Sequence, residues 1–281
     1  MPHKPHFSDP PTLAADYMLR WRLTEDGPDI RTASSYLRPV LHDGASAMLK
    51  ITDDPDEQRG NSLMALWAGH GAASVIKYDQ NAILLERAVT GESLVDIVYA
   101  GSDDIATRHI CCVAALLHSQ HVMPGIEMQA LEEWFSDLLA LPDQSEDWLI
   151  SCARQAHALL RQQNETVNLH GDLHHGNILN FGTGDWRAID PKGLFGERTA
   201  EYAALFLNPD LADERRPYAT LQKNFERRLN VVSACARVEP VRLLKWIHAW
   251  SGLSAIWFIE EGLKPKTQRH IAELAAKALN L

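Results

Sequence analysis

The chain has 281 residues, which is enough for two domains or for one large one. Its formal net charge is −10, whereas nucleic-acid-binding proteins need clustered basic side chains to neutralise phosphates, so we expect no nucleic-acid partner. The N-terminus lacks the apolar core of a secretory signal, and Lys245 and His248 interrupt the best apolar stretch, 243–259. We therefore expect a cytoplasmic protein with no membrane span, and the acidic balance is compatible with a cationic small-molecule partner.

The first ninety residues are dominated by apolar runs of strand length separated by turn signals. The runs at 30–41 and 45–51 flank the sequence His-Asp-Gly, a pattern that is typical of an antiparallel hairpin. Several carboxylates and a proline at 53–56 are typical of a helix N-terminus. The elements predicted after this point are a helix over 56–68 and strands at 74–78 and 82–88.

From about residue 88 onwards the apolar residues follow the 3.6-residue period of helices. Helical stripes run through 105–117, 131–139 and 243–257, and the last one carries three tryptophans that are typical of core packing. Short strands are predicted inside this half at 167–169, 178–181 and 186–189. A β-rich front and a mostly helical back are typical of an α+β protein with two lobes. We place the boundary between 1–88 and 89–281.

The segment that carries chemistry is Leu-His-Gly-Asp-Leu-His-His-Gly-Asn-Ile-Leu at 169–179, followed downstream by Asp190. Phosphoryl transfer needs a carboxylate at the acceptor hydroxyl and oxygen ligands that hold Mg²⁺ on the nucleotide phosphates. Asp172 fits the first role, and Asn177 and Asp190 can supply the oxygens that Mg²⁺ prefers. A loop between two strands can direct Asp172 and Asn177 at one point. The pattern therefore predicts a phosphotransferase.

The combination of His-Gly-Asp-x(4)-Asn and Ile-Asp-Pro resembles the aminoglycoside phosphotransferase branch of the protein-kinase-like fold. The longer phrases His-Gly-Asp-Leu-His-His-Gly-Asn-Ile and Ile-Asp-Pro-Lys-Gly-Leu-Phe-Gly-Glu resemble the streptomycin 6-kinase and hydroxyurea phosphotransferase group in particular. The similarity extends from about Trp21 to about Glu261. It implies a bilobal fold with a small β-rich N-lobe and a larger, mostly helical C-lobe. It also implies ATP and Mg²⁺ as cofactors and a small-molecule hydroxyl as the acceptor.

The resemblance assigns a role to individual residues of the chemical site. Asp172 would orient the acceptor hydroxyl and accept its proton, while Asn177 and Asp190 would bind magnesium. Lys50 would contact the α- and β-phosphates, and Glu57 would form an ion pair with it.

The resemblance also places the nucleotide on the N-lobe. The backbone of the segment 85–88, which includes Glu86 and Ala88, would read the adenine. Ser34 and Ser35 lie where a phosphate-covering loop belongs, although the glycine pattern of protein kinases is missing there.

Two differences from protein kinases narrow the class of molecule that can be the acceptor. Gly171 stands where protein kinases carry the arginine that reads a phosphorylated activation loop. Only a short connection fits between Asp190 and the helical segment near Ala200, and no Ala-Pro-Glu signal follows. We therefore expect a constitutively competent kinase of a small molecule.

Acidic residues follow Asp190 and also end the tryptophan-rich helix, and carboxylates pair bidentately with guanidinium groups. The candidates for binding a cationic acceptor are Glu197, Glu201, Asp210, Asp213, Glu260 and Glu261. From this set we select Glu197 and one of Glu260 or Glu261.

Other hypotheses fit parts of the same sequence. His170, His174 and His175 with Asp172 resemble a zinc cluster of a hydrolase, because imidazoles at such spacing bind zinc. A catalytically silent nucleotide-binding module would keep the fold without turnover. The acceptor is expected to be an aminoglycoside such as streptomycin, with hydroxyurea or another metabolic alcohol as alternatives. His170 is expected to be structural, and Lys192 to contact either phosphate or solvent.

Overall fold

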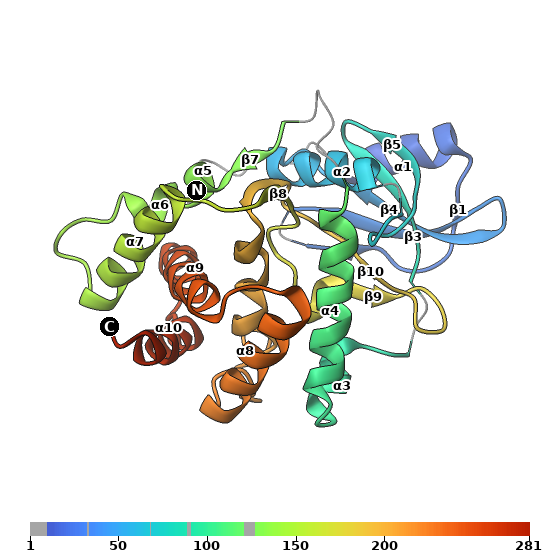
Figure 1. The fold of residues 1–281 in the computed structure, drawn as a ribbon. Helices are drawn as coiled ribbons and strands as arrows, with labels where there is room; N and C mark the ends of the chain where they lie inside the picture. The colour runs from blue at the N-terminus through green and yellow to red at the C-terminus, as the bar shows by residue number, and fades with distance from the viewer. Residues whose placement is uncertain (1–9, 33, 68, 89–90, 121–126) are drawn as a thin grey trace.

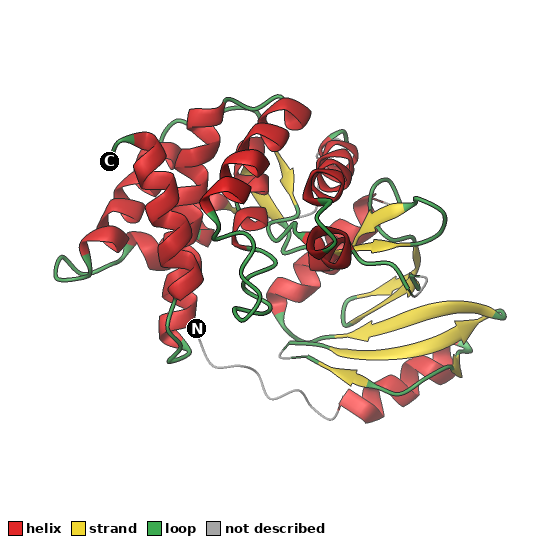
Figure 2. Ribbon diagram, turned by 90° about the horizontal axis from the view of Figure 1, so that it is seen from below, coloured by secondary structure: helices red, strands yellow, loops and turns green. Residues whose placement is uncertain are grey.

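The computed structural model describes residues 10–32, 34–67, 69–88, 91–120 and 127–281. A small lobe built on a β-sheet lies beside a larger lobe that is mostly helical (Figure 1), and Figure 2 shows the long strands gathered on one side of the molecule. This confirms the predicted α+β fold with two lobes. Residues 89 and 90, at the expected boundary, lie outside the described residues, so the boundary stays a prediction.

The small lobe is organised around one sheet with the strand order β1-β3-β4-β6-β5, and β2 also pairs with β3. Its elements are α1 (Pro10–Trp21), β1 (Thr24–Glu25), β2 (Ile30–Arg31), β3 (Tyr36–His42), β4 (Ala45–Ile51), α2 (Pro55–Trp67), β5 (Val75–Asp79) and β6 (Ala82–Glu86). The predicted hairpin is confirmed, because β3 pairs antiparallel with β4 as far as His42 and Ala45. Asp43 and Gly44 both have positive φ, as a two-residue hairpin turn requires.

Helix α1 lies in the front part of the chain, where the sequence predicts mostly strand. The helix packs on β3 and β4 and buries Ala14, Tyr17 and Trp21 in a small core with Val40 and Leu49. Three buried residues in twelve make a narrow stripe, which is a weak periodic signal.

The larger lobe is built from helices around α9, which packs against α7 and α10 (Figure 1). Its helices are α3 (Leu94–Tyr99), α4 (Asp103–His118), α5 (Leu131–Trp134), α6 (Ser136–Leu139), α7 (Asp147–Leu160), α8 (Gln222–Ala236), α9 (Pro240–Glu260) and α10 (Lys266–Leu279). Trp246 and Trp250 of α9 pack edge-on against Phe135. The interpretation of the tryptophan stripe as core is confirmed for these two rings.

Short strands and 3₁₀ turns of the larger lobe carry the chemical segment. They are β7 (Gln129–Ala130), β8 (Thr166–Leu169), η1 (His175–Asn177), β9 (Ile178–Asn180), β10 (Trp186–Ala188), β11 (Leu194–Glu197), η2 (Arg198–Tyr202) and η3 (Ala204–Leu207). The predicted strands β8, β9 and β10 are confirmed. The short connection expected between Asp190 and the helical segment near Ala200 is confirmed, since η2 begins at Arg198, but it contains an unpredicted strand, β11, which pairs with β8 and with β7. These partners lie far away in the sequence, so no local pattern revealed the strand.

The two lobes share one apolar core. Leu63, Met64 and Trp67 of α2 belong to the same buried cluster as the helices of the larger lobe. Helix α2 is therefore held by the larger lobe as well as by its own sheet, and this positions the residues that α2 contributes to the site.

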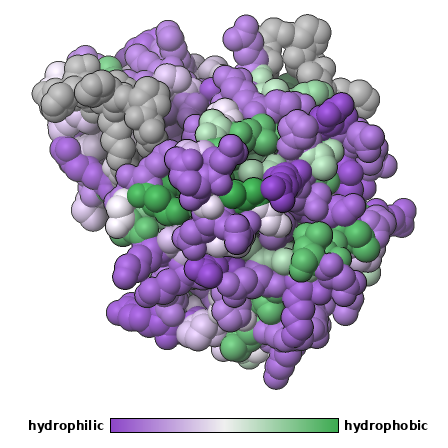
Figure 3. Space-filling view, turned by 90° about the vertical axis from the view of Figure 1, so that its left-hand side faces the viewer, coloured by the Kyte–Doolittle hydropathy of each residue, from purple (hydrophilic) through white to green (hydrophobic). Residues whose placement is uncertain are grey.

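Among the described residues, no helix is both long and apolar enough to cross a membrane. The face seen in Figure 3 is mostly hydrophilic, and its hydrophobic groups form small separate patches. Large exposed apolar side chains such as Leu19, Ile105 and Leu263 lie on different segments. Scattered groups of this kind are normal for a protein surface.

Candidate active site

The loop between β8 and β9 carries the residues that the sequence analysis selected, and its backbone is tightly packed. Gly171 has a φ of +81°, and a Cβ added there would lie 2.6 Å from Leu194 Cδ1. A side chain at this position would therefore meet β11. The glycine that replaces the arginine of protein kinases is required here by packing as well as by backbone conformation.

His170 stabilises the loop through hydrogen bonds to its backbone and to Ile189. Its Nε2 donates to the carbonyl oxygen of Ile189 at 2.8 Å, and its Nδ1 accepts from the Asp172 amide at 3.2 Å. The ring also stacks on Trp67 of α2, with the ring centroids 6.2 Å apart. Burial lowers the pKa of His170, which favours the neutral ring that both hydrogen bonds need. The expected structural role of His170 is confirmed.

Asp172 and Asn177 face each other across the loop. Asn177 Nδ2 donates to the Asp172 carbonyl oxygen at 2.8 Å and to its Oδ2 at 3.0 Å, which leaves Asn177 Oδ1 available as a neutral oxygen ligand. His174 Nε2 lies 3.6 Å from Asp172 Oδ1. Desolvation raises the pKa of Asp172, but His174 and Lys192 outweigh it and hold that pKa below its ordinary value. The carboxylate is thus ionised and oriented.

Asp190 reaches the same place from the following strand. The Ile189 amide donates to the Asn177 carbonyl oxygen at 2.9 Å, so the β9–β10 ladder places Asp190 beside Asn177. Asp190 has a φ of +62°, a backbone conformation that non-glycine residues rarely adopt and that is frequent at functional sites. Desolvation raises its pKa, but the charges of Lys50 and Lys192 lower the pKa to about 2.

The small lobe contributes an ion pair to this cluster. Lys50 at the end of β4 contacts both Glu57 of α2 and Asp190, and all three charges meet between the lobes. The predicted Lys50–Glu57 pair is confirmed. Glu57 lies in the first turn of α2, where Asp54 caps the amides of Asp56 and Glu57. The contact of Lys50 with phosphates stays a prediction.

Ser34 and Ser35, which are expected to cover the phosphates, lie in the loop that joins the antiparallel strands β2 and β3. Ser34 Oγ donates to Glu57 Oε1 at 3.2 Å, and the Ser34 carbonyl oxygen accepts from Thr52 Oγ1 at 2.8 Å. Ser35 is buried, and its hydroxyl has no partner among the described residues. The loop thus lies beside the Lys50–Glu57 pair. Binding of phosphate by this loop stays a prediction.

The predicted adenine-reading segment, 85–88, begins inside β6 and extends past its end. The Glu86 amide donates to the Ser74 carbonyl oxygen at 2.9 Å, and its side chain accepts from Arg187 Nη1 at 2.8 Å. Glu86 therefore ties the sheet to the β9–β10 hairpin. The Ala88 amide has no hydrogen-bond partner among the described residues, and the reading of adenine by this segment stays a prediction.

From the sequence, Lys192 could contact either phosphate or solvent. Its Nζ lies 2.8 Å from Glu57 Oε1 and 4.0 Å from Asp190 Oδ2. Burial lowers the pKa of Lys192, but Asp190 and Glu57 raise it above the ordinary value, so the side chain is charged. The pairing joins residues on different lobes, and no local sequence signal could have revealed it.

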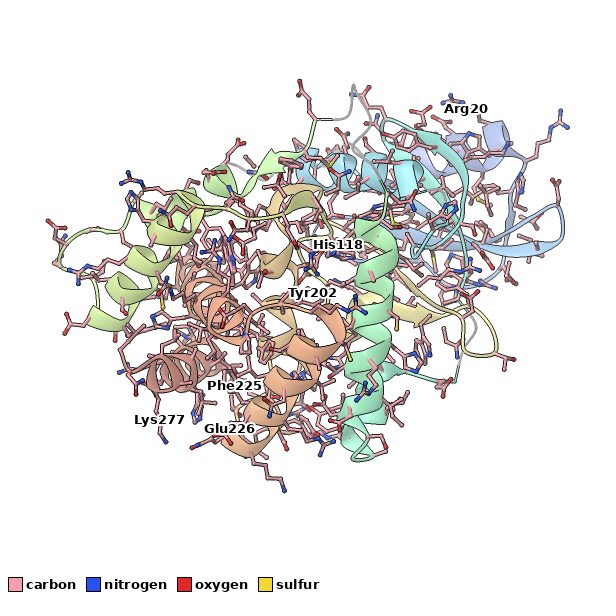
Figure 4. All side chains as sticks on the ribbon, viewed as in Figure 1. Arg20, His118, Tyr202, Phe225, Glu226 and Lys277 are labelled. Atoms are coloured by element: carbon pink, nitrogen blue, oxygen red, sulfur yellow. The ribbon has the colours of Figure 1, made fainter. Side chains whose placement is uncertain are left out.

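Glu201 is a second residue whose role only the structure revealed. Its carboxylate accepts from the backbone amides of His170 at 2.7 Å and Gly171 at 3.0 Å, and His118 Nε2 lies 3.1 Å from it. Figure 4 shows His118 on α4 beside Tyr202, the neighbour of Glu201. Glu201 therefore holds the start of the catalytic loop and is not available to bind an acceptor.

The expectation that Glu197 binds a cationic acceptor is contradicted. Its side chain is 1% exposed, both carboxylate oxygens are bound by Arg242, and the Asn164 amide donates to Oε2 at 3.1 Å. Asp210 is likewise buried and accepts hydrogen bonds from the backbone amides of 218–220. Such carboxylates are already satisfied by the chain itself. Glu260 and Glu261 are exposed at the end of α9, and their role in acceptor binding stays a prediction.

The three histidines of the proposed zinc cluster point in different directions, so they do not form a metal site. His170 faces Ile189, His174 faces Asp172, and His175 points into a buried ion pair beneath the loop. Among the described residues, no three His, Cys, Asp or Glu side chains gather in a metal-binding geometry. The three imidazoles therefore serve different parts of the loop.

The ion pair beneath the loop joins α4 to α8. Arg228 Nη2 lies 2.7 Å from Asp103 Oδ1, and Arg228 also donates to the carbonyl oxygens of Leu205 and Asn208. His175 Nε2 lies 3.8 Å from the same Asp103 oxygen. Burial lowers the pKa of His175 to about 4, so the ring is neutral in the folded protein near neutral pH.

The pKa of His175 predicts a pH dependence of stability. Between about pH 6.5 and pH 4 the unfolded chain binds a proton on this ring that the folded protein does not bind. The free energy of unfolding should therefore fall as the pH is lowered through this window, by about 3 kcal/mol from this group. Urea denaturation at several pH values should show a shallower fall in His175→Gln. The exposed His157→Gln variant is the control, and parallel curves for His175→Gln and wild type would contradict the prediction.

A small lobe with a Lys–Glu ion pair, facing an Asp, an Asn and a second Asp on a helical lobe, defines a protein-kinase-like phosphotransferase. The chain belongs to the aminoglycoside/hydroxyurea antibiotic resistance kinases, whose family model matches residues 20–262. The resemblance inferred from the sequence is thereby confirmed.

Individual relatives agree with this family. The chain is 46% identical over 245 residues to a streptomycin 3''-kinase of Klebsiella pneumoniae, and the aligned residues cover 87% of this chain and 92% of the relative. It is 29% identical over 264 residues to a streptomycin 6-kinase of Streptomyces glaucescens, covering 90% of this chain and 84% of the relative. The solved structure of an amicoumacin kinase in complex with AMP-PNP and Ca²⁺ matches with a TM-score of 0.67 and 14% identity, over 97% of this chain and 93% of that chain. At this identity the structural match shows the fold alone.

Proposed function

We propose that this protein transfers the γ-phosphoryl group of ATP to a hydroxyl of streptomycin, with Mg²⁺ as the metal, in the cytoplasm. The observation that carries the proposal is the meeting of Lys50, Glu57, Asp172, Asn177 and Asp190 between the lobes. The 46% identity to a streptomycin kinase over most of both chains supports the choice of acceptor.

The donor set fits a magnesium nucleotide. Asn177 is held through its amide nitrogen, so its oxygen is left for a ligand, and Asp190 is ionised at any pH above about 2. Hard cations such as Mg²⁺ prefer oxygen ligands of this kind. When bound, the metal supplies positive charge that stabilises the transferring phosphoryl group.

The side chains of the chain position the remaining partners. Lys50, held by Glu57, offers its ammonium group to the nucleotide phosphates, and the Ala88 amide offers a donor to the base. Asp172 accepts a hydrogen bond from the acceptor hydroxyl and takes its proton as the new bond to the γ-phosphorus forms and the bond from that phosphorus to the oxygen of the leaving ADP breaks. The residues up to 88 thus serve the nucleotide, and residues 89–281 provide the metal ligands, the catalytic aspartate and the acceptor site.

Relatives of this chain act on more than one position of streptomycin. The identity to the 3''-kinase exceeds that to the 6-kinase, so we propose the 3'' hydroxyl as the one phosphorylated. Streptomycin carries guanidinium groups, which fit the net charge of −10 and the exposed carboxylates of Glu260 and Glu261.

The test is ADP release with Mg-ATP across a panel of streptomycin, other aminoglycosides, hydroxyurea and simple amino alcohols. We expect streptomycin to stimulate ADP release far more than any other compound, and NMR of the product to place phosphate on the 3'' position. Stimulation by hydroxyurea alone would overturn the acceptor. Tight ATP binding with no stimulation by any compound would support the catalytically silent module instead.

A further inference from the structure

We propose that Lys192 is a positioning residue, and that the segment 191–193 locks α2 onto the larger lobe so that Glu57 permanently holds Lys50 in the site. The inference rests on the proposed function, because it concerns the Lys–Glu pair of that site. In protein kinases the corresponding helix position and its ion pair are controlled by phosphorylation of the activation loop. We name the segment 191–193 the latch.

The first observation is the balance of charge around Glu57. Its carboxylate receives Lys50 on Oε2, and Lys192 and Ser34 on Oε1. Lys50 also contacts Asp190, so two ammonium groups and two carboxylates form one cluster of balanced charge, in which Lys50 and Glu57 are buried and Lys192 and Asp190 are partly exposed. Removal of the Lys192 charge would leave two carboxylates against one ammonium group. Glu57 and Asp190 would then compete for Lys50, since a buried unpaired charge is strongly unfavourable.

The second observation is close packing between α2 and the latch. A Cβ added to Gly60 of α2 would lie 1.9 Å from the Pro191 carbonyl oxygen, a distance that no side chain tolerates. A Cβ added to Gly193 would lie 2.8 Å from Arg59 Cγ, and Gly193 has a φ of +71°. Glycines on both sides therefore allow the helix and the latch to touch directly.

The third observation is that the latch is itself fixed to the catalytic loop. The Lys192 amide donates to the His170 carbonyl oxygen at 2.7 Å, and the Gly193 carbonyl oxygen accepts from the Gln129 amide at 3.0 Å. Gln129 Oε1 in turn accepts from Arg59 Nη1 at 3.1 Å. Helix α2 thus contacts a segment that is hydrogen-bonded to His170, at the start of the catalytic loop that carries Asp172.

These contacts separate the role of Lys192 from that of Lys50. The Lys192 ammonium group is bound to Glu57, and it acts on the nucleotide through the position of Lys50. Loss of Lys192 should therefore weaken the productive binding of ATP. It should also release α2, which a lysine that only contacted phosphate would not do.

The experiment compares Lys192→Met with Lys192→Arg and with Gly60→Ala, which leaves every charge in place and wedges α2 away from Pro191. The exposed Lys264→Met variant is the matched control. Steady-state kinetics give kcat and the KM values for ATP and for streptomycin, and amide hydrogen exchange follows the peptide 55–67. We expect Lys192→Met and Gly60→Ala to lower kcat/KM for ATP by about 10²-fold, as a displaced catalytic group does. The KM for streptomycin should stay within a few-fold, exchange in α2 should be faster, and Lys192→Arg should recover most of the activity.

Two results would overturn the latch. The first is kcat/KM for ATP near the wild-type value in both Lys192→Met and Gly60→Ala. The second is lost activity with unchanged exchange in α2, which would make Lys192 a direct phosphate contact. If the wild-type protein showed no streptomycin-dependent turnover, the proposed acceptor would fail, while exchange in α2 of the variants would still decide the latch.

Discussion

Replacement of Asp172 by asparagine should lower kcat by about 10²–10⁴-fold, the range that a positioned general base contributes. Asparagine keeps the size of the side chain and can still accept the hydrogen bond from Asn177, but it cannot take the proton of the acceptor hydroxyl. Lys50 and Asp190 reach the site from other segments, so the affinity for Mg-ADP should change little. Streptomycin-dependent ADP release and calorimetric titration with Mg-ADP measure the two quantities.

The control for this prediction is Asp143→Asn, which removes an exposed carboxylate from the loop between α6 and α7. Its turnover should equal that of the wild type. Full turnover in Asp172→Asn would exclude Asp172 as the base. A parallel loss of Mg-ADP affinity would instead indicate that the substitution disturbs the whole loop.

The largest effect on stability is expected from Arg228→Met. The Arg228 side chain is 1% exposed and binds Asp103, whose side chain is also 1% exposed, together with two backbone carbonyl oxygens. Methionine would leave the Asp103 charge buried without its partner, which typically costs about 3–5 kcal/mol of the free energy of unfolding. Because His175 lies against Asp103, the catalytic loop should also become more mobile. Urea denaturation measures the loss.

Neighbouring residues provide a matched control on the same two helices. Arg227 pairs with Asp104 in the same way, but both side chains are about two-fifths exposed. Arg227→Met should therefore lower the free energy of unfolding by only about 0–1 kcal/mol. Equal losses in Arg227→Met and Arg228→Met would show that burial of the pair is unimportant. In Arg228→Met, the second substitution Asp103→Asn should restore part of the stability, because it removes the unpaired charge.

Much of the candidate site could be predicted because its residues are close together in the sequence. The loop from His170 to Asn177 lies between two strands that each carry their own apolar pattern, so its local geometry follows from a short segment. The hairpin β3–β4 is similar, since a two-residue turn sets its register. The Lys50–Glu57 pair was expected from the resemblance to a known fold and is confirmed.

The erroneous acceptor assignment of Glu197 has a general cause. The sequence records that a carboxylate is present, but its availability depends on which cation folding brings to it. Glu197 meets Arg242 from α9, and Glu201 meets two amides of the catalytic loop. In the sequence both are candidates for binding a cationic acceptor, whereas in the structure each stabilises the large lobe.

The local patterns, with the family resemblance that they carry, determined the class of this protein, its two lobes and the residues of its catalytic loop, whereas the acidic balance only argued against a nucleic-acid partner. Hydrophobic periodicity and turn chemistry act over a few residues, so they can be recognised without knowledge of the fold. Only the tertiary structure decided which charges are paired, that Lys192 binds Glu57 across the lobes, and that Gly60 lies against Pro191. These contacts join segments more than a hundred residues apart, and their energies depend on burial, which no local pattern encodes.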